Sequence, residues 1–153
     1  MQVSDPELYE RPFLFATGHG VMKFSDVDRD RLRNYLNAGG FLFINDSYGM
    51  ESGVRQELRE LFPGRELTEL PFGHEIYHSY YDFPAGLPKI HEHDGKPPRG
   101  YAILIDNRVA VFLALESDIG DGWEDPHVHN DPPEKRLAAL RMGVNLMAYA
   151  LRN

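Results

Sequence analysis

The 153-residue chain contains no cysteine. This absence excludes disulfide bonds, zinc sites made from thiolates and catalysis by a cysteine nucleophile. Any metal site must be built from imidazole and carboxylate groups, which 7 histidines and 24 acidic residues supply. Cysteine-free chains occur in exported and in cytosolic proteins alike, so the absence leaves the compartment open.

Basic residues are also scarce. The chain has 16 lysines and arginines against 24 acidic residues, which gives a net charge of −8 and a pI near 5.3. Phosphate backbones and anionic membrane surfaces are bound by basic faces. The composition therefore argues against nucleic acid as a partner and disfavours binding to an anionic membrane surface.

Long hydrophobic runs are missing as well. The strongly apolar run from Val109 to Leu115 is far shorter than the roughly 18 to 20 residues that a membrane-spanning helix needs. No segment with a basic start and an apolar core precedes Asp5. Apolar residues still make up 42% of the chain, enough for one core, so residues 1–153 are predicted to form a single domain without membrane insertion.

The first half of the chain alternates between strand and helix patterns. Residues 13–16 and 41–44 are apolar runs without alternation, as expected for strands that are covered on both faces. Ser25 begins an amphipathic segment that ends at Gly39, and residues 51–62 form a second one before Pro63. This order favours a parallel sheet with helices packed on its faces.

The second half indicates a hairpin and a long helix. Residues 101–105 and 109–115 are strand-like runs separated by three polar residues, which predicts an antiparallel hairpin over 101–115. The chain ends in a predicted amphipathic helix with one broad apolar face. That face comprises Leu137, Leu140, Met142, Val144, Leu146, Met147 and Leu151.

Residues 74–94, HEIYHSYYDFPAGLPKIHEHD, are the leading candidate for a functional segment. They hold four histidines, three tyrosines and four carboxylates without a helical or alternating apolar period. A long loop that is dense in such groups more often lines a site than merely joins two elements. We interpret the tyrosines as packing residues, and we expect the end of the segment that contains His91 to supply the functional side chains.

Further candidates follow the predicted strands. In open α/β sheets the ligand crevice lies beyond the carboxyl ends of the strands. His19 follows the first strand, Asp46 the second, and Glu116 and Asp118 the return strand of the hairpin. These four residues are predicted to supply general acid and base groups, although Asp46 could equally cap the next helix.

Histidine spacing suggests a metal. His91 and His93 would share one face of an extended segment, His78 lies four residues after His74, and His127 and His129 repeat the spacing of two. We assign His78, His91 and His93 as candidate ligands of zinc, manganese, iron or nickel, among which the sequence does not choose. The alternative is that these histidines bind loop backbone and fix its shape.

Five segments taken together resemble a known family. These segments are PFLFATGHG, AGGFLFINDSYG, LPFGHEIYHSYYDFPAGLPKIHEHDG, ESDIGDGWEDPHVHND and RMGVNLMAYAL. In combination they resemble the bacterial family known as domain of unknown function 4159, over nearly the whole chain. That family is similar to the class I glutamine amidotransferase-like superfamily.

The resemblance implies a flavodoxin-like three-layer α/β/α fold and a location in the cell envelope or periplasm. Amidotransferase activity is not implied, because those enzymes use a cysteine nucleophile and the residues after the second strand here are Asp46, Ser47 and Tyr48. Longer relatives carry a further strand and helix before the equivalent of Ser4. A second copy of this chain could therefore complete a missing edge, as a homodimer.

Three interpretations remain open. The first is a metal-assisted hydrolase or lyase acting on a small molecule at the carboxyl edge of the sheet. The second is a non-catalytic module that binds carbohydrate or assembles with cell-envelope proteins, with Trp123 as a ligand-binding or loop-pinning residue. The third is a purely architectural loop, with the sheet edge used for dimerisation.

Overall fold

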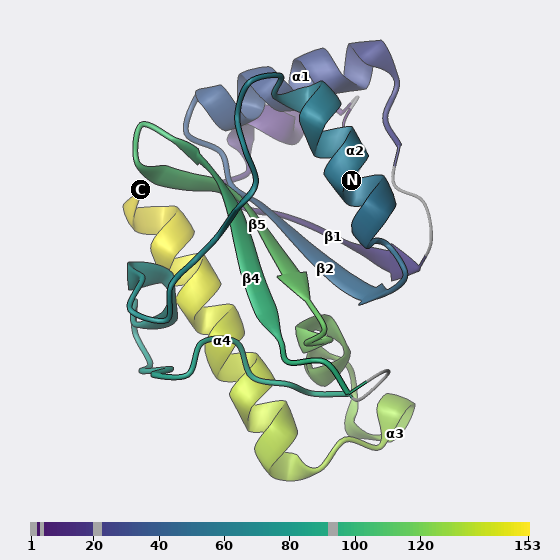
Figure 1. Cartoon of the computed structure of the whole chain (residues 1–153), viewed down its shortest axis with the longest axis vertical. Coiled ribbons are helices and arrows are strands. Elements are labelled where there is room, and N and C mark those ends of the chain that lie inside the picture. Colours follow the sequence, from purple (N-terminus) through teal and green to yellow (C-terminus); the bar gives the residue numbers. More distant parts are fainter. Residues whose placement is uncertain (1–2, 4, 20–22, 92–94) are drawn as a thin grey trace.

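A computed structural model describes the chain except at residues 1–2, 4, 20–22 and 92–94, and shows a five-stranded mixed sheet (Figure 1). Neighbouring strands β1, β2 and β5 are parallel, whereas β4 runs antiparallel to both β5 and β3. Across the sheet the strands are β1 (Leu14–His19), β2 (Leu42–Tyr48), β5 (Arg108–Leu115), β4 (Arg99–Ile105) and β3 (Thr68–Glu69). The predicted mixed α/β architecture, with most strands in one direction, is confirmed.

Helices cover both faces of this sheet (Figure 1). Helices α1 (Asp26–Asn37) and α2 (Glu51–Leu61) pack on one face, and α4 (Pro133–Arg152) packs on the other. The remaining helical pieces are short. They are η1 (Pro6–Glu10), η2 (Glu75–Tyr77), η3 (Ile119–Trp123) and α3 (Pro126–His129).

Local sequence explains the main boundaries. The Ser25 hydroxyl accepts a hydrogen bond from the Asp28 amide at 3.1 Å, so α1 begins with the side-chain cap that its sequence predicts. Asp106 and Asn107 both have positive φ, 53° and 65°, which is the backbone of a two-residue hairpin turn. The hairpin predicted over 101–115 is confirmed as β4 and β5.

The two faces of the sheet bury separate cores. Apolar side chains of α1 and α2 pack with Ile44 and Leu113 on one face. On the other face, Phe43 and Phe112 pack with α4 and with the loop that follows β3. Strand β5 is buried from Val109 to Leu115 because it lies inside the sheet and is covered on both faces.

The loop that carries the histidines is docked on α4. The Asn145 side chain, buried in α4, accepts hydrogen bonds from the amides of Tyr80 and Tyr81 at 3.1 and 2.7 Å. It also donates to the Tyr81 carbonyl at 2.8 Å. Tyr77 is buried beneath this part of the loop, whereas the Tyr80 side chain is exposed. The loop is therefore fixed before it reaches the carboxyl edge of the sheet.

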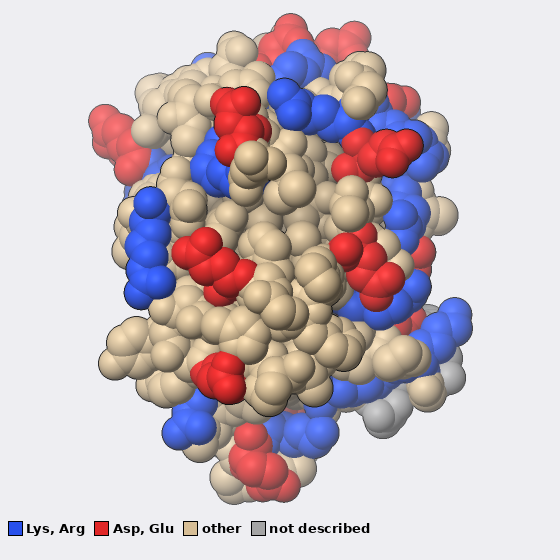
Figure 2. All heavy atoms as spheres, turned by 60° about the vertical axis from the view of Figure 1, so that its left-hand side comes forward, with Lys and Arg blue, Asp and Glu red and all other residues tan. Residues whose placement is uncertain are grey.

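The surface shows no stripe of basic charge on the face in Figure 2, where basic and acidic side chains are interspersed. None of the helices in the described part of the chain combines the length and the apolar character that crossing a bilayer requires.

Candidate metal centre

The end of the loop after β3 is held against the end of β5. The Ile90 amide donates to the Ser117 carbonyl at 2.8 Å, and the Ser117 hydroxyl donates to the Pro88 carbonyl. These two bonds align the loop with the first residues beyond the strand. As a result, His91 lies at the carboxyl edge of the sheet, where the strand order had predicted a site.

The backbone turns sharply where β5 ends. Glu116 and Asp118 both adopt left-handed backbone conformations, with φ of 61° and 59°. Non-glycine residues rarely do so, and such strain is concentrated at functional sites. The turn leaves the Asp118 side chain only 1% exposed and starts η3, in which the Asp121 amide donates to the Asp118 carbonyl at 3.1 Å.

Three side chains converge beyond this turn. Asp121 Oδ2 lies 3.0 Å from His91 Nδ1, and Asp121 Oδ1 lies 3.5 Å from His129 Nε2. The two imidazole rings are 5.4 Å apart between centroids and are inclined at 67°. Each of the three residues offers one ligand atom, and these atoms all lie within 4.8 Å of one another.

More carboxylates surround the two imidazoles. Asp131, nearly buried, pairs with His91 Nε2, while Asp118 Oδ2 lies 3.8 Å from His91 Nδ1. Glu124 accepts a hydrogen bond from His129 Nε2 at 3.1 Å. That hydrogen bond, together with the charges of nearby acids, raises the pKa of His129. Four carboxylates around two imidazoles create a negative potential that favours a bound cation.

The donor set fits a divalent metal. Ligand atoms bonded to a tetrahedral metal at about 2.1 Å are about 3.4 Å apart, so a spread of 4.8 Å closes with shifts of about an ångström. Histidine ligands commonly donate their other ring N–H to a carboxylate, which fixes the tautomer and the ring orientation. Asp131 holds His91 in this way. The His91 Nδ1 atom, which faces Asp121, is thus the nitrogen oriented for a metal.

Some predicted site residues meet at this centre and others do not. His91 and Asp118 are neighbours in it, and Glu116 lies beside it with its Oε2 atom 4.0 Å from the Lys89 ammonium. His19 ends β1, but its side chain is not among those that the structure describes. His93 lies outside the described residues, so its assignment as a ligand stays a prediction.

His78 and Asp46 have partners of their own. His78 Nδ1 pairs with Asp82 and its Nε2 with the Phe72 carbonyl at 2.8 Å, so both ring nitrogens brace the loop and His78 does not join the His91 cluster. The Phe72 carbonyl and then Asp82 raise the pKa of His78. Asp46 Oδ1 accepts from the Met50 amide at 3.0 Å, at the start of α2.

Asp121, His129 and Asp131 are members of the cluster that the sequence interpretation did not select. The available signal was the GDGWEDPHVHND stretch, with His127 and His129 two residues apart. In the structure this piece is the one-turn helix α3, in which residues two apart do not share a face. Consequently only His129 belongs to the cluster, while His127 is exposed.

Trp123 fixes the segment that carries Asp121. Its indole Nε1 donates to the Ala139 carbonyl of α4 at 2.7 Å. Its ring packs against those of Phe15 and Phe43, with centroids 5.2 and 5.6 Å away. The indole thus pins the loop between β5 and α4, and its N–H is already used within the chain.

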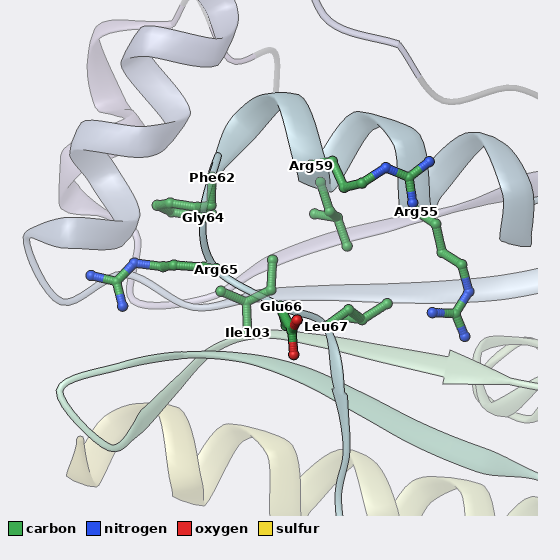
Figure 3. Close-up of a pocket in the computed structure, with 9 residues that line it drawn as sticks. Arg55, Arg59, Phe62, Gly64, Arg65, Glu66, Leu67 and Ile103 are labelled. Carbon is green, nitrogen blue, oxygen red and sulfur yellow. The ribbon is translucent and has the colours of Figure 1, made fainter.

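A pocket of about 470 Å³ lies under α2, on the face of the sheet opposite to α4 (Figure 3). Arginines 55, 59 and 65 line it above an apolar floor, but their side chains point in different directions in Figure 3 rather than at one point. Arg55 donates to Glu51 at 2.9 Å and Arg65 to the Leu104 carbonyl at 3.0 Å. The pocket is therefore not an assembled anion site.

A family model described as domain of unknown function (DUF4159) matches residues 1–151 of the chain. No curated protein matches its sequence.

Proposed function

The chain belongs to the family described as domain of unknown function (DUF4159), and we propose that it holds a divalent metal ion at His91, Asp121 and His129. In this proposal the ion serves a metal-assisted hydrolase or lyase whose substrate is a small molecule or a carbohydrate. The observation that carries the proposal is the convergence of the three ligand atoms within 4.8 Å, with Asp131 bound to the far nitrogen of His91.

Two imidazoles and one carboxylate suit zinc, manganese, iron or nickel. The same donor set with open positions is found in catalytic zinc sites and in non-haem iron sites, whereas structural zinc sites use four protein ligands. The histidines at this centre are partly exposed, with side chains 23% and 29% accessible, so a substrate can approach them from solvent.

Each neighbouring residue has a distinct task in this proposal. A bound ion would supply a polarised or deprotonated water at neutral pH. Asp118, buried 3.8 Å from His91, is positioned to accept the proton of such a water. Glu116 lies beside the Lys89 ammonium, which also donates to the Lys96 carbonyl, so this pair helps to fix the loop that leads to His91.

For the fold we propose the amidotransferase-like arrangement, with the reactive groups at a different position in the sheet. What supports this is a sheet covered by helices on both faces, with three parallel neighbouring strands whose carboxyl ends lie at one edge of the sheet. Amidotransferases carry the nucleophile after a strand, whereas here Asp46, within β2, accepts a hydrogen bond from the amide of Met50. The reactive groups come instead from the segment after β5 and from the loop after β3.

Metal analysis of untagged protein tests the proposal. After loading with zinc, manganese, iron(II) or nickel and dialysis, wild type is expected to retain one equivalent of at least one metal, and His91→Ala or His129→Ala to lose it. His127→Ala is the matched control, because it removes an exposed histidine two residues away. Absence of a bound metal in wild type, or equal losses in His127→Ala and His129→Ala, overturns the proposal.

Catalysis is tested separately with the loaded protein. Chromogenic esters, phosphate esters and glycosides are offered with and without a chelator. Turnover that needs the metal and falls at least about 100-fold in Asp118→Asn, whose metal content stays near one equivalent, supports the proton-accepting role. Equal turnover by Asp118→Asn and wild type contradicts it.

A further inference from the structure

The segment that carries His129 is not anchored by buried side chains. Residues 124–131, which we call the strap, connect η3 to α4 and contain the one-turn helix α3, at the periphery of the molecule (Figure 1). No residue from 124 to 130 is buried, and the apolar Val128 is 48% exposed. Segments with few buried apolar contacts open locally at a small cost in free energy.

Both ends of the strap are fixed. Before it, the Trp123 indole donates to the Ala139 carbonyl of α4 at 2.7 Å. After it, the Arg136 amide donates to the Pro132 carbonyl at 3.1 Å, and the Arg136 guanidinium donates to the Glu124 carbonyl at 3.1 Å. The middle of the strap can therefore swing out and return while η3 and α4 stay in place, as hinged segments do.

Two charged side chains tie the middle of the strap to the metal centre. Asp131 pairs with His91 Nε2, and the Asp131 side chain is only 4% exposed. His129 Nε2 lies 3.5 Å from Asp121 Oδ1. Among the residues that the structure describes, no other hydrogen bond or ion pair joins residues 126–131 to a residue outside the strap. The groups of the centre themselves thus hold the strap closed.

The closed strap favours a positive charge at the centre. It adds the carboxylates of Glu124 and Asp131 to the acids already there. When the Nε2–H of His91 donates to Asp131, the Nδ1 atom of His91 carries a lone pair, which faces Asp121 Oδ2 at 3.0 Å. Two acceptors at this distance repel each other. A divalent ion bound to both atoms replaces that repulsion by attraction.

We propose that the strap is a lid on the metal centre, held closed by the ion at His129 and by Asp131, and readily opened when the ion is absent. The inference rests on the proposed function, since it takes His91, Asp121 and His129 as the ligands. His129 is the ligand that the strap contributes, whereas His91 and Asp121 belong to the body of the protein. The ion joins the two parts, so its entry and exit require the strap to open.

Linkage sets the size of the effect. When the free metal concentration is about 100 times the dissociation constant, an opening that must release the ion becomes about 100-fold rarer. The Val128 amide donates to the Asp125 carbonyl at 3.0 Å within the strap, so its hydrogen exchanges with solvent when the strap opens. We expect this exchange to slow by about 10- to 100-fold on metal loading, the lower figure allowing for fraying of a one-turn helix.

Hydrogen exchange of the full chain, followed by mass spectrometry, tests the proposal. Metal-free protein is compared at one pH with protein loaded with zinc, manganese, iron(II) or nickel, and the bound metal is measured on each sample. A peptide covering residues 124–131 is expected to exchange about 10- to 100-fold more slowly in the loaded protein. A peptide covering η1, which packs on the other face of the sheet, is expected to keep its rate.

The outcomes separate the strap from the site. A retained equivalent of metal with an unchanged exchange rate in residues 124–131 overturns the lid and leaves the proposed function standing. Absence of bound metal overturns both. Equal slowing in the strap and in η1 also overturns the lid, because the ion would then act on the whole protein rather than on this segment.

Two aspartates of the strap provide matched variants. Asp131→Ala removes the tie to His91, whereas Asp125→Ala removes an exposed side chain that makes no capping hydrogen bond. Each variant is loaded at the same multiple of its own measured dissociation constant. Exchange in the strap is expected to be at least about 10-fold faster in Asp131→Ala, since a charge-assisted hydrogen bond is lost. Equal exchange rates in the two variants overturn the closing role of Asp131.

Discussion

Replacement of Asn145 by leucine tests how the loop over the second core is held. The substitution keeps the volume of the side chain and removes three hydrogen bonds, two from the amides of Tyr80 and Tyr81 and one to the Tyr81 carbonyl. At about 1 kcal/mol for each bond, the expected loss is about 3 kcal/mol of unfolding free energy. The loss reaches about 5 kcal/mol if the abandoned backbone groups stay closed to water.

Urea unfolding followed by circular dichroism measures this loss. For a chain of this length, about 3 kcal/mol corresponds to a fall of about 6 to 12 °C in the melting temperature. Asn34→Leu is the control, because it makes the same change at an exposed position of α1. A loss below about 1 kcal/mol, or one equal to that of the control, would refute the conclusion that Asn145 fastens the loop to α4.

Three further predictions concern the metal centre, the partly buried His74 and a tight packing contact at Gly100. Asp131→Asn, which weakens the partner of His91, is expected to lower metal affinity by about 10- to 100-fold in a competition titration. Burial lowers the pKa of His74, so its contribution to stability is present above about pH 6.5 and is lost as pH falls through the folded-state pKa. The stability of wild type relative to His74→Asn should therefore fall as pH drops below about 6.5 in urea titrations. Gly100→Ala places a methyl group 2.1 Å from the buried Tyr77 hydroxyl and should cost about 1 to 3 kcal/mol by the same assay, whereas an unchanged unfolding free energy would contradict the packing of Tyr77 against β4.

Much of the fold was predictable because its signals are local. Apolar runs, a serine cap and polar turn residues gave the strands and helices that surround the sheet, including the turn at Asp106 and Asn107. Strand β3 was not predicted, since two paired residues, Thr68 and Glu69, carry no periodic pattern. Its pairing depends on Leu70, whose amide donates to the Gly100 carbonyl at 2.8 Å, thirty residues along the chain.

The candidate centre was predictable only in part. His91 was selected from the density and spacing of histidines in residues 74–94, and Asp118 because it follows the return strand of the hairpin. Asp121 and His129 reach the same point only through the path of the segment after β5, with left-handed backbone at Glu116 and again at Asp118. No pattern in the sequence fixes such a path, because it depends on contacts with α4 and with the loop after β3.

Helix α4 shows a similar limit. Its periodicity predicted one broad apolar face, whereas the structure separates that face into a buried row and an exposed one. Met142 and Leu146 belong to the first row, and Leu140 and Val144 to the second. A helical wheel cannot tell one wide buried stripe from two adjacent stripes of which only one is buried. The difference depends on how much of the helix the sheet covers.

The position of β5 also governs the order in which the protein can fold. This strand lies between β2 and β4, so the sheet is incomplete until residues 108–115 are available. Strands β1 and β2 and helices α1 and α2, which come first from the ribosome, lack the partner that covers the open edge of β2. Contacts between segments more than 60 residues apart slow folding. Nascent chains that stop before residue 108 are therefore expected to stay sensitive to proteases and to expose the edge of β2 to other chains.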